Sequence, residues 1–186
     1  MRVIATELDG VVIVEPRRAA DARGWFMELW RDSHADADPR LPARFVQDNV
    51  SVSCAGVLRG LHLQHPTAQG KLVSVLAGEV LDVAADVRHG SPTFGRWVGV
   101  TLSAQNGRQL YIPPGFAHGF AVTEGDAVVS YKCTAYYEPA HEITVRWDDP
   151  TIGVAWPVDA AIVSPRDAAA RTLAEFAPHE LPPYAG

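Results

Sequence analysis

Residues 57–71 read Val-Leu-Arg-Gly-Leu-His-Leu-Gln-His-Pro-Thr-Ala-Gln-Gly-Lys, an apolar, strand-like run that is interrupted by a histidine and two cations. Side chains of a strand alternate between its two faces. This alternation predicts that His62 and Gln64 point into one space and that Arg59 points away from them. Glycine inside a strand often marks a bulge, and a bulge at Gly60 would turn Arg59 back toward His62. The alternation leaves both orientations of Arg59 open.

The rest of the chain repeats the same kind of pattern. Short runs of alternating or β-branched residues are separated by Gly, Pro and Asp turn signals, which is typical of an all-β sandwich or barrel. The predicted strands cover residues 10–15, 24–30, 45–53, 57–64, 71–77, 80–87, 96–102, 109–112, 119–123 and 127–134. Residues 32–42 are predicted to form a short helix or a loop. A late helix is predicted to start after Ser164 as N-cap, with Pro165 at its first position, and to continue to residue 176.

Gly78-Glu79 is predicted to be the turn of a hairpin between residues 71–77 and 80–87. With the register set by this turn, one face of the hairpin carries a lysine, two aspartates and small apolar residues. These residues are Lys71, Val73, Val75, Val80, Asp82, Ala84 and Asp86. Lys71 is therefore expected to lie next to Asp82 and Asp86.

Length and composition limit the class of protein. A chain of 186 residues with 47% hydrophobic residues predicts one domain, residues 1–186, around one substantial core. A net charge of -6 argues against nucleic-acid and anionic-membrane partners, which attract basic surfaces. Cys54 and Cys133 are far apart and are expected to be two buried, unpaired thiols in a reducing compartment. No apolar run has the length of a membrane span or a secretion signal, so we expect a cytoplasmic protein.

Pro-Gly-Phe-Ala-His at residues 114–118 resembles the second motif of the cupin proteins. The first cupin motif supplies two histidines one residue apart, then a glutamate and a glycine. In this chain Gln64 stands in place of the second histidine, Lys71 lies near the glutamate position, and Gly78 matches the glycine. An ammonium repels a divalent cation and an amide is a poor ligand for transition metals. The residues therefore predict a cavity without a metal, in which Lys71 could stabilise a developing oxyanion.

Three alternatives stay open at this point. His62 and His118 could be hydrogen-bonded core residues, with Lys71 a surface residue. A metal-dependent cupin enzyme could use His62, His65 and His118 as ligands. A non-catalytic cupin could bind a sugar without chemistry.

Eight stretches extend a resemblance over most of the chain. They are residues 21–28, 47–51, 57–62, 69–73, 91–95, 112–120, 131–132 and 147–150. Together they resemble the dTDP-4-dehydrorhamnose 3,5-epimerase family. The resemblance implies an all-β cupin-type double-stranded β-helix, or jelly roll, with short C-terminal helices. It also implies a homodimer, no cofactor, and epimerisation of a dTDP-4-keto-6-deoxyhexose at C3 and C5. A relative that inverts only one of these centres is the alternative.

The resemblance also implies roles for individual residues. His62 would be the base, Tyr131 the acid and Lys71 the group that stabilises the enolate. Asp167 would orient His62, although a helix-capping role is an alternative. Asp82 is counted among the substrate-binding residues, with an ordinary cross-strand ion pair to Lys71 as the alternative. The diphosphate would be bound by Arg23, Arg59 and Arg166, the last standing where the family usually has lysine. Sugar and nucleotide would be bound by Glu28, Gln47, Asn49, His118, Tyr137 and Glu142, with Tyr137 preferred over its neighbour Tyr136.

Overall fold

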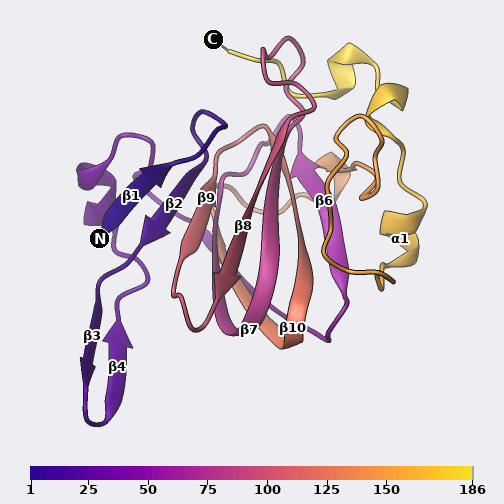
Figure 1. Cartoon of the computed structure of the whole chain (residues 1–186). Helices are drawn as coiled ribbons and strands as arrows, with labels where there is room; N and C mark the ends of the chain where they lie inside the picture. The colour runs from indigo at the N-terminus through magenta and orange to yellow at the C-terminus, as the bar shows by residue number, and fades with distance from the viewer. Residues whose placement is uncertain (186) are drawn as a thin grey trace.

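The computed structural model describes residues 1–185 and is built around one continuous antiparallel sheet that rolls up on itself (Figure 1). Its main path runs in the order β1-β2-β9-β7-β10-β6-β11, with β8 added to β7 and β5 added to β10. The bounds are β1 Arg2–Ala5, β2 Val12–Glu15, β5 Gln47–Ser53, β6 Leu58–Gln64, β7 Lys71–Asp86, β8 Trp97–Ser103, β9 Gln109–Ile112, β10 Phe116–Cys133 and β11 Glu142–Thr144. A separate hairpin consists of β3 Arg18–Asp21 and β4 Gly24–Met27.

Two long strands shape the roll, and here the predicted hairpin at Gly78 is wrong. β7 runs through Gly78 without a turn, and β10 likewise joins the two strands predicted at 119–123 and 127–134. Gly78 has φ of +73°, and a Cβ there would lie 2.3 Å from the carbonyl oxygen of Asp126. The pairing of β7 with β10 shifts register around this point. Glycine therefore allows both strands to bend and cross from one sheet layer to the other.

The predicted alternation along β7 is correct even though the turn is not. Val73, Val75, Val80 and Ala84 enter the central core with residues from β8, β9 and β10. The opposite face of the same strand packs outward. Leu72 joins a cluster beneath the N-terminal segment, and Val83 joins a cluster beneath the C-terminal segment. The central barrel is therefore covered on both sides, which agrees with a jelly roll.

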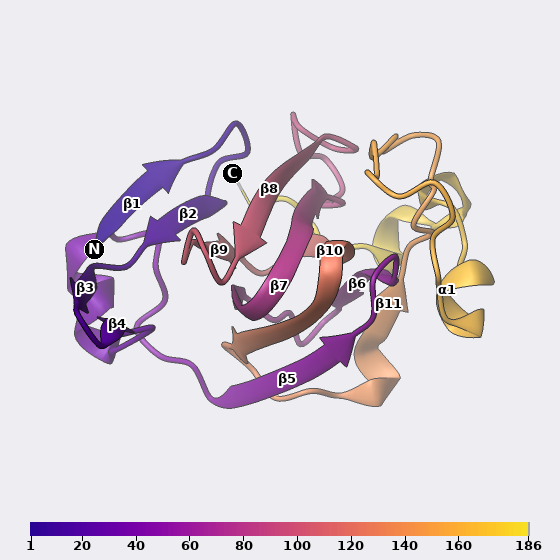
Figure 2. The ribbon, with the colours of Figure 1, turned by 60° about the horizontal axis from the view of Figure 1, so that its bottom comes forward.

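The N-terminal strands and helix α1 lie on opposite sides of the roll. In Figure 2 the β1–β2 pair lies on one side and the C-terminal helix α1 (Pro165–Ala168) on the other. The late helix is shorter than predicted, because α1 ends at Ala168, although Ser164 caps it as expected by accepting a hydrogen bond from the Asp167 amide at 3.1 Å. The other helical turns are η1 Asp32–Ala37, η2 Pro139–His141, η3 Leu173–Glu175 and η4 Pro178–Glu180.

The β3–β4 hairpin extends away from the roll (Figures 1 and 2). At its base, Arg18 donates hydrogen bonds to the carbonyl oxygens of Ala104 and Gln105, and its guanidinium lies over the ring of Trp25. Trp25 and Phe26 are 53% and 73% exposed. The hairpin thus presents large apolar side chains to its surroundings.

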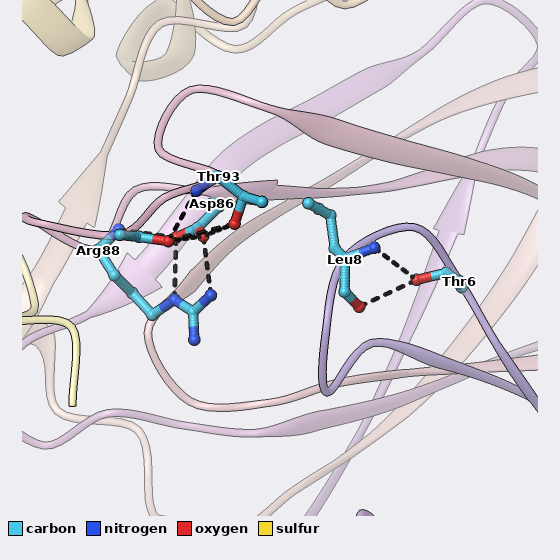
Figure 3. Close-up of polar contacts among 6 residues, drawn as sticks. Thr6, Leu8, Asp86, Arg88 and Thr93 are labelled. Atoms are coloured by element: carbon cyan, nitrogen blue, oxygen red, sulfur yellow. Dashed lines mark hydrogen bonds and ion pairs between the residues drawn. The ribbon is translucent and has the colours of Figure 1, made fainter. Parts of the chain in front are cut away.

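A polar network closes one end of β7 (Figure 3). Asp86 is fully buried and accepts hydrogen bonds from Arg88, Ser91 and Thr93 at 2.6 to 3.0 Å. Burial alone would raise the pKa of the Asp86 carboxyl, but these donors outweigh burial and lower it. The expected contact between Asp86 and Lys71 is therefore wrong. Figure 3 also shows the Thr6 hydroxyl bonded to Leu8, in the turn that places Leu8 in the core.

Candidate active site

A histidine and a carboxylate form the first pair of the site. The Nε2 atom of His62 lies 2.7 Å from Oδ1 of Asp167, whose side chain is 3% exposed. Asp167 also accepts from the amide of Gly60 at 3.4 Å, while its own amide donates to Ser164. Burial raises the pKa of Asp167, but the hydrogen bonds from His62, Gly60 and Ser164 outweigh it and lower that pKa. A carboxylate only accepts, so Nε2 carries a hydrogen and Nδ1 keeps its lone pair. The carboxylate of Asp167 is thus the partner of His62, whereas only the backbone amide of Asp167 takes part in the helix cap.

A bulge in β6 settles the direction of Arg59. His62 pairs with His118 and Arg59 pairs with Phe120, so two residues of β6 face one residue of β10. Gly60 has φ of +132°, and a Cβ there would lie 2.6 Å from Cα of Gly119. Arg59 therefore lines the same space as His62, and its Nε donates to the hydroxyl of Ser53 at 3.0 Å. Strict alternation fails here because the extra residue shifts the faces by one position.

The cavity lies within the roll and has two adjoining parts that share His62, Lys71 and Tyr131. The outer part has a volume of about 310 Å³ and is lined by Gln47, Asn49, His62, Leu63, Gln64, Gln69, Lys71, Tyr131, Tyr137, Glu142 and Arg166. The inner part has a volume of about 210 Å³ and is lined by Ser51, Arg59, His62, Lys71, His118, Phe120 and Tyr131. A groove behind His62 is lined by Val57, Leu58, Arg59, His62, Ile162, Val163, Ser164, Arg166 and Asp167. Of the fourteen residues predicted for the site, eleven line the two cavity parts or this groove.

Lys71 reaches into the cavity from the start of β7. Its ammonium donates to the carbonyl oxygen of His62 at 3.4 Å. Burial disfavours the charged form and lowers the pKa of Lys71 from 10.5. Tyr131 faces the same cavity from β10, and burial raises the pKa of its phenol above 10.0. In its charged form the lysine supplies a positive charge to the cavity, and the raised pKa of the tyrosine keeps on its phenol a proton that it can donate.

A second histidine and carboxylate pair lies deeper. Nε2 of His118 is 2.8 Å from Oδ1 of Asp82, and burial lowers the pKa of His118. Asp82 is fully buried and does not line the cavity. Asp82 lies behind His118 and holds that ring, so it does not reach the cavity where a ligand was expected to contact it. Within residues 1–185 no ion pair joins Asp82 to Lys71, although the charge of Asp82 favours the charged form of Lys71.

The outer rim carries a chain of polar contacts. The Tyr137 hydroxyl donates to Oε2 of Glu142, and Arg166 contacts the same oxygen at 2.8 Å. Contact with Glu142 raises the pKa of Tyr137. Gln47 donates to Asn49 at 3.0 Å and accepts from the amide of Tyr137 at 2.8 Å. Tyr137, not Tyr136, lines the cavity, as expected.

Two predicted site residues lie elsewhere. Arg23 is in the turn of the β3–β4 hairpin, where it pairs with Asp21 at 2.6 Å and is 90% exposed. Glu28 follows β4 and pairs with Arg31 at 2.6 Å and with His34 at 3.2 Å. Neither residue lines the cavity of its own chain. Cys54 also differs from expectation, because it is exposed, whereas Cys133 is buried.

Some lining residues were not predicted. Gln69, Ser51 and Phe120 belong to the cavity wall. For Ser51 a signal was available, since it alternates with the predicted Gln47 and Asn49 along β5. Among residues 1–185, no group of three or more His, Cys, Asp or Glu residues has the geometry to hold a metal ion. No helix in that range is long and apolar enough to cross a membrane.

Together, these groups can remove a proton from a carbon next to a carbonyl group and return one to it. An oriented imidazole can remove a proton, a phenol can return one, and an ammonium in the same cavity can balance charge on oxygen.

Comparison with known proteins agrees with this chemistry. A dTDP-4-dehydrorhamnose 3,5-epimerase from Neisseria gonorrhoeae is 52% identical over 176 residues, which are 94% of this chain and 53% of that protein. The chain thus spans about half the length of that relative. The enzyme of the same name from Methanothermobacter thermautotrophicus is 49% identical over 89% of this chain and 91% of its own length. The crystal structure of a Legionella pneumophila 3,5-epimerase in complex with dTDP-4-keto-L-rhamnose superposes with a TM-score of 0.96 at 49% identity. It covers 100% of this chain and 99% of its own.

The fold and these relatives thus place the chain among the cupin-fold carbohydrate epimerases, a class of isomerase. The family model described as dTDP-4-dehydrorhamnose 3,5-epimerase matches residues 5–175. The protein belongs to this family.

Proposed function

We propose that the protein inverts C3 and C5 of a dTDP-4-keto-6-deoxyhexose. The observation that carries this proposal is that His62, Lys71 and Tyr131 line one cavity while buried Asp167 holds His62. The 4-keto group acidifies the hydrogens on the two neighbouring carbons. Nδ1 of His62 takes one of them, and the electron pair moves onto the ketone oxygen as an enolate. Tyr131 then protonates the carbon from the other face.

Lys71 stabilises the negative charge that develops on the ketone oxygen. Its ammonium is held in the barrel, where a charge interacts with a developing oxyanion more strongly than in water. His118, fixed by Asp82, lines the inner part of the cavity beside Lys71 and is placed to contact the sugar. The roles of these residues are part of the proposal.

The nucleotide diphosphate is proposed to extend from the cavity toward the rim. Arg59 and Arg166 border the groove behind His62 and offer guanidinium groups, which bind phosphate oxygens in a bidentate manner. Gln47, Asn49, Tyr137 and Glu142 line the outer part and supply polar and aromatic contacts for nucleoside and sugar. The Legionella relative was solved with a dTDP-linked keto sugar, which supports a ligand of this class.

Inversion of a single centre is the second candidate. A 3'-monoepimerase from Streptomyces bikiniensis, solved in complex with dTDP, superposes with a TM-score of 0.88 at 36% identity, over 97% of this chain and 92% of its own. The higher identity to the Legionella 3,5-epimerase favours inversion at both carbons.

Solvent exchange distinguishes these two reactions. Incubation of the protein with the dTDP-4-keto-6-deoxy sugar in D₂O is expected to place deuterium at both C3 and C5, as observed by NMR. Deuterium at one carbon alone would establish the single-centre reaction. Binding of the sugar without any exchange would contradict the proposal and indicate a binding protein.

We further propose a homodimer in which the β3–β4 hairpin of one chain reaches the cavity of its partner. Arg23 and Glu28 match family binding positions but lie outside their own cavity, while Trp25 and Phe26 beside them are exposed. The outer face of the roll adds exposed Val50, Val52 and Leu76. Large apolar side chains exposed on one chain are typical of subunit interfaces.

Sedimentation velocity tests the dimer. We expect a particle of twice the 20.1 kDa chain mass, and Phe26→Asp is expected to shift it toward the monomer and weaken substrate binding. A monomeric wild-type protein with full activity would contradict the shared site. We also propose a cytoplasmic location, in keeping with a nucleotide-linked substrate and two unpaired cysteines.

A further inference from the structure

Three glutamines hold the segment that carries Tyr137. Residues 135–138 lie in neither strand nor helix, so their backbone groups have no ladder partners. Gln69 Nε2 donates to the carbonyl of Ala135 at 2.8 Å, and Gln64 Nε2 donates to the carbonyl of Tyr136 at 3.2 Å. The following two amides donate to glutamine oxygens: Tyr137 to Gln47 and Glu138 to Gln64, each at 2.8 Å. Four successive residues are thus fixed by side chains from three separate parts of the chain.

Gln64 is the centre of this glutamine clamp, by which we mean Gln47, Gln64 and Gln69. Its side chain contacts the Tyr136 carbonyl and the Glu138 amide, as described above, and also donates to the carbonyl of Thr67 at 2.8 Å. It is 3% exposed, so its amide atoms depend on these partners. Gln64 occupies the place of the second histidine of the cupin motif. The residue that binds a metal in that motif is replaced here by a glutamine that binds backbone groups.

The clamp fixes backbone while leaving the side chains above it open. Tyr136 is 67% exposed and Tyr137 is 47% exposed, although the peptide groups between them are bonded. The Tyr137 hydroxyl in turn bonds Glu142, which Arg166 contacts. An exposed aromatic side chain on an immobilised backbone is a preorganised surface for a ligand, because the cost of ordering it has been met on folding.

We propose that Gln64, with Gln47 and Gln69, is a positioning residue that sets the affinity for the nucleotide part of the substrate by holding Tyr137 in place. This inference rests on the proposed function. Gln64 acts through the backbone of residues 135–138. The proton-transfer groups His62 and Tyr131 are held by other contacts. Its loss therefore affects binding more than chemistry.

The test replaces Gln64 by methionine, which has a similar shape and no amide. The dissociation constant of dTDP, measured by calorimetry, is expected to rise about tenfold, whereas kcat for deuterium exchange at saturating substrate stays within about threefold. Hydrogen exchange of the Tyr137 and Glu138 amides is expected to accelerate. Gln69→Met, which removes one contact, is expected to show a smaller effect and serves if Gln64→Met does not fold.

Gln109→Met is the matched control. Gln109 is equally buried and donates to Ser74 at 2.8 Å, but it does not line the cavity. An equal loss of dTDP binding in Gln109→Met, or native dTDP binding in Gln64→Met, would overturn the inference. If wild-type protein neither bound dTDP nor exchanged deuterium, the proposed function would fail instead, and the amide exchange data would still report on the clamp.

Gln64→Glu is expected to recover dTDP binding at low pH, an effect that general destabilisation of the fold would not produce. As a carboxylate it repels the carbonyl oxygens of Thr67 and Tyr136, whereas the protonated acid can donate to one of them and accept from the Glu138 amide. The ratio of variant to wild-type dTDP dissociation constants is therefore expected to fall as the pH is lowered through the range where the glutamate protonates. A ratio that does not change with pH would contradict the clamp.

Discussion

His62→Ala is expected to lower the incorporation of solvent deuterium at both C3 and C5 by about 10⁴-fold, the upper end of what a positioned general base contributes. The reason is geometric. Asp167 binds Nε2 and leaves Nδ1 as a base inside the cavity, next to the lysine that would stabilise the product of proton removal. The measurement is NMR of the keto sugar after incubation with the variant in D₂O.

Two further variants sharpen this result. Asp167→Asn is expected to cost about 10²-fold, because an amide can donate to Nε2 and so favour the tautomer that places the hydrogen on Nδ1. His179→Ala, a change at an exposed histidine outside the cavity, is expected to exchange deuterium at the wild-type rate. Exchange near the wild-type rate in a folded His62→Ala protein would remove this residue from the role of base.

Much of the barrel could be predicted because its signals are local. Within each half of β7, alternation correctly separates Val73 from Leu72 and Val80 from Val83, since the period of a strand is a property of its own backbone. Gly78 misled the prediction. Glycine with positive φ suits a hairpin turn and a bend within a strand equally well, and only the position of Asp126 on β10 decides between them.

The site, like the fold, could be predicted where the sequence signals are local and could not where they depend on distant segments. Several lining residues of β5, β6 and β10, such as Gln47, His62 and Tyr131, follow from motif and alternation, whereas contacts made over long sequence distances do not. Nothing near Gln64 in the sequence reveals that its partners are Tyr136 and Glu138. In the same way, the motif around Arg23 predicts a phosphate contact but does not reveal which chain of an assembly supplies the phosphate.

Lys71→Met is expected to reduce kcat by about 10²- to 10³-fold, the loss typical of a missing oxyanion donor. The methionine keeps the length of the side chain within the barrel and removes the charge. The substrate dissociation constant is expected to change less than kcat, because the ammonium acts most strongly on charge that develops in the transition state. A higher substrate dissociation constant with kcat unchanged would assign Lys71 to ground-state binding instead.

The pH dependence of kcat provides a second, independent reading of the same residue. Burial lowers the pKa of Lys71 below 10.5 and raises that of Tyr131 above 10.0. As the pH rises, Lys71 therefore loses its proton at a lower pH than an ordinary lysine, and Tyr131 loses its proton at a higher pH than an ordinary tyrosine. We expect the alkaline decline of kcat to reflect Lys71. Lys71→Arg, whose guanidinium stays charged, is expected to move that decline to higher pH even if its maximal rate is lower. An alkaline limb at the same pH in Lys71→Arg would assign the decline to another group and would remove the charge of Lys71 from the mechanism.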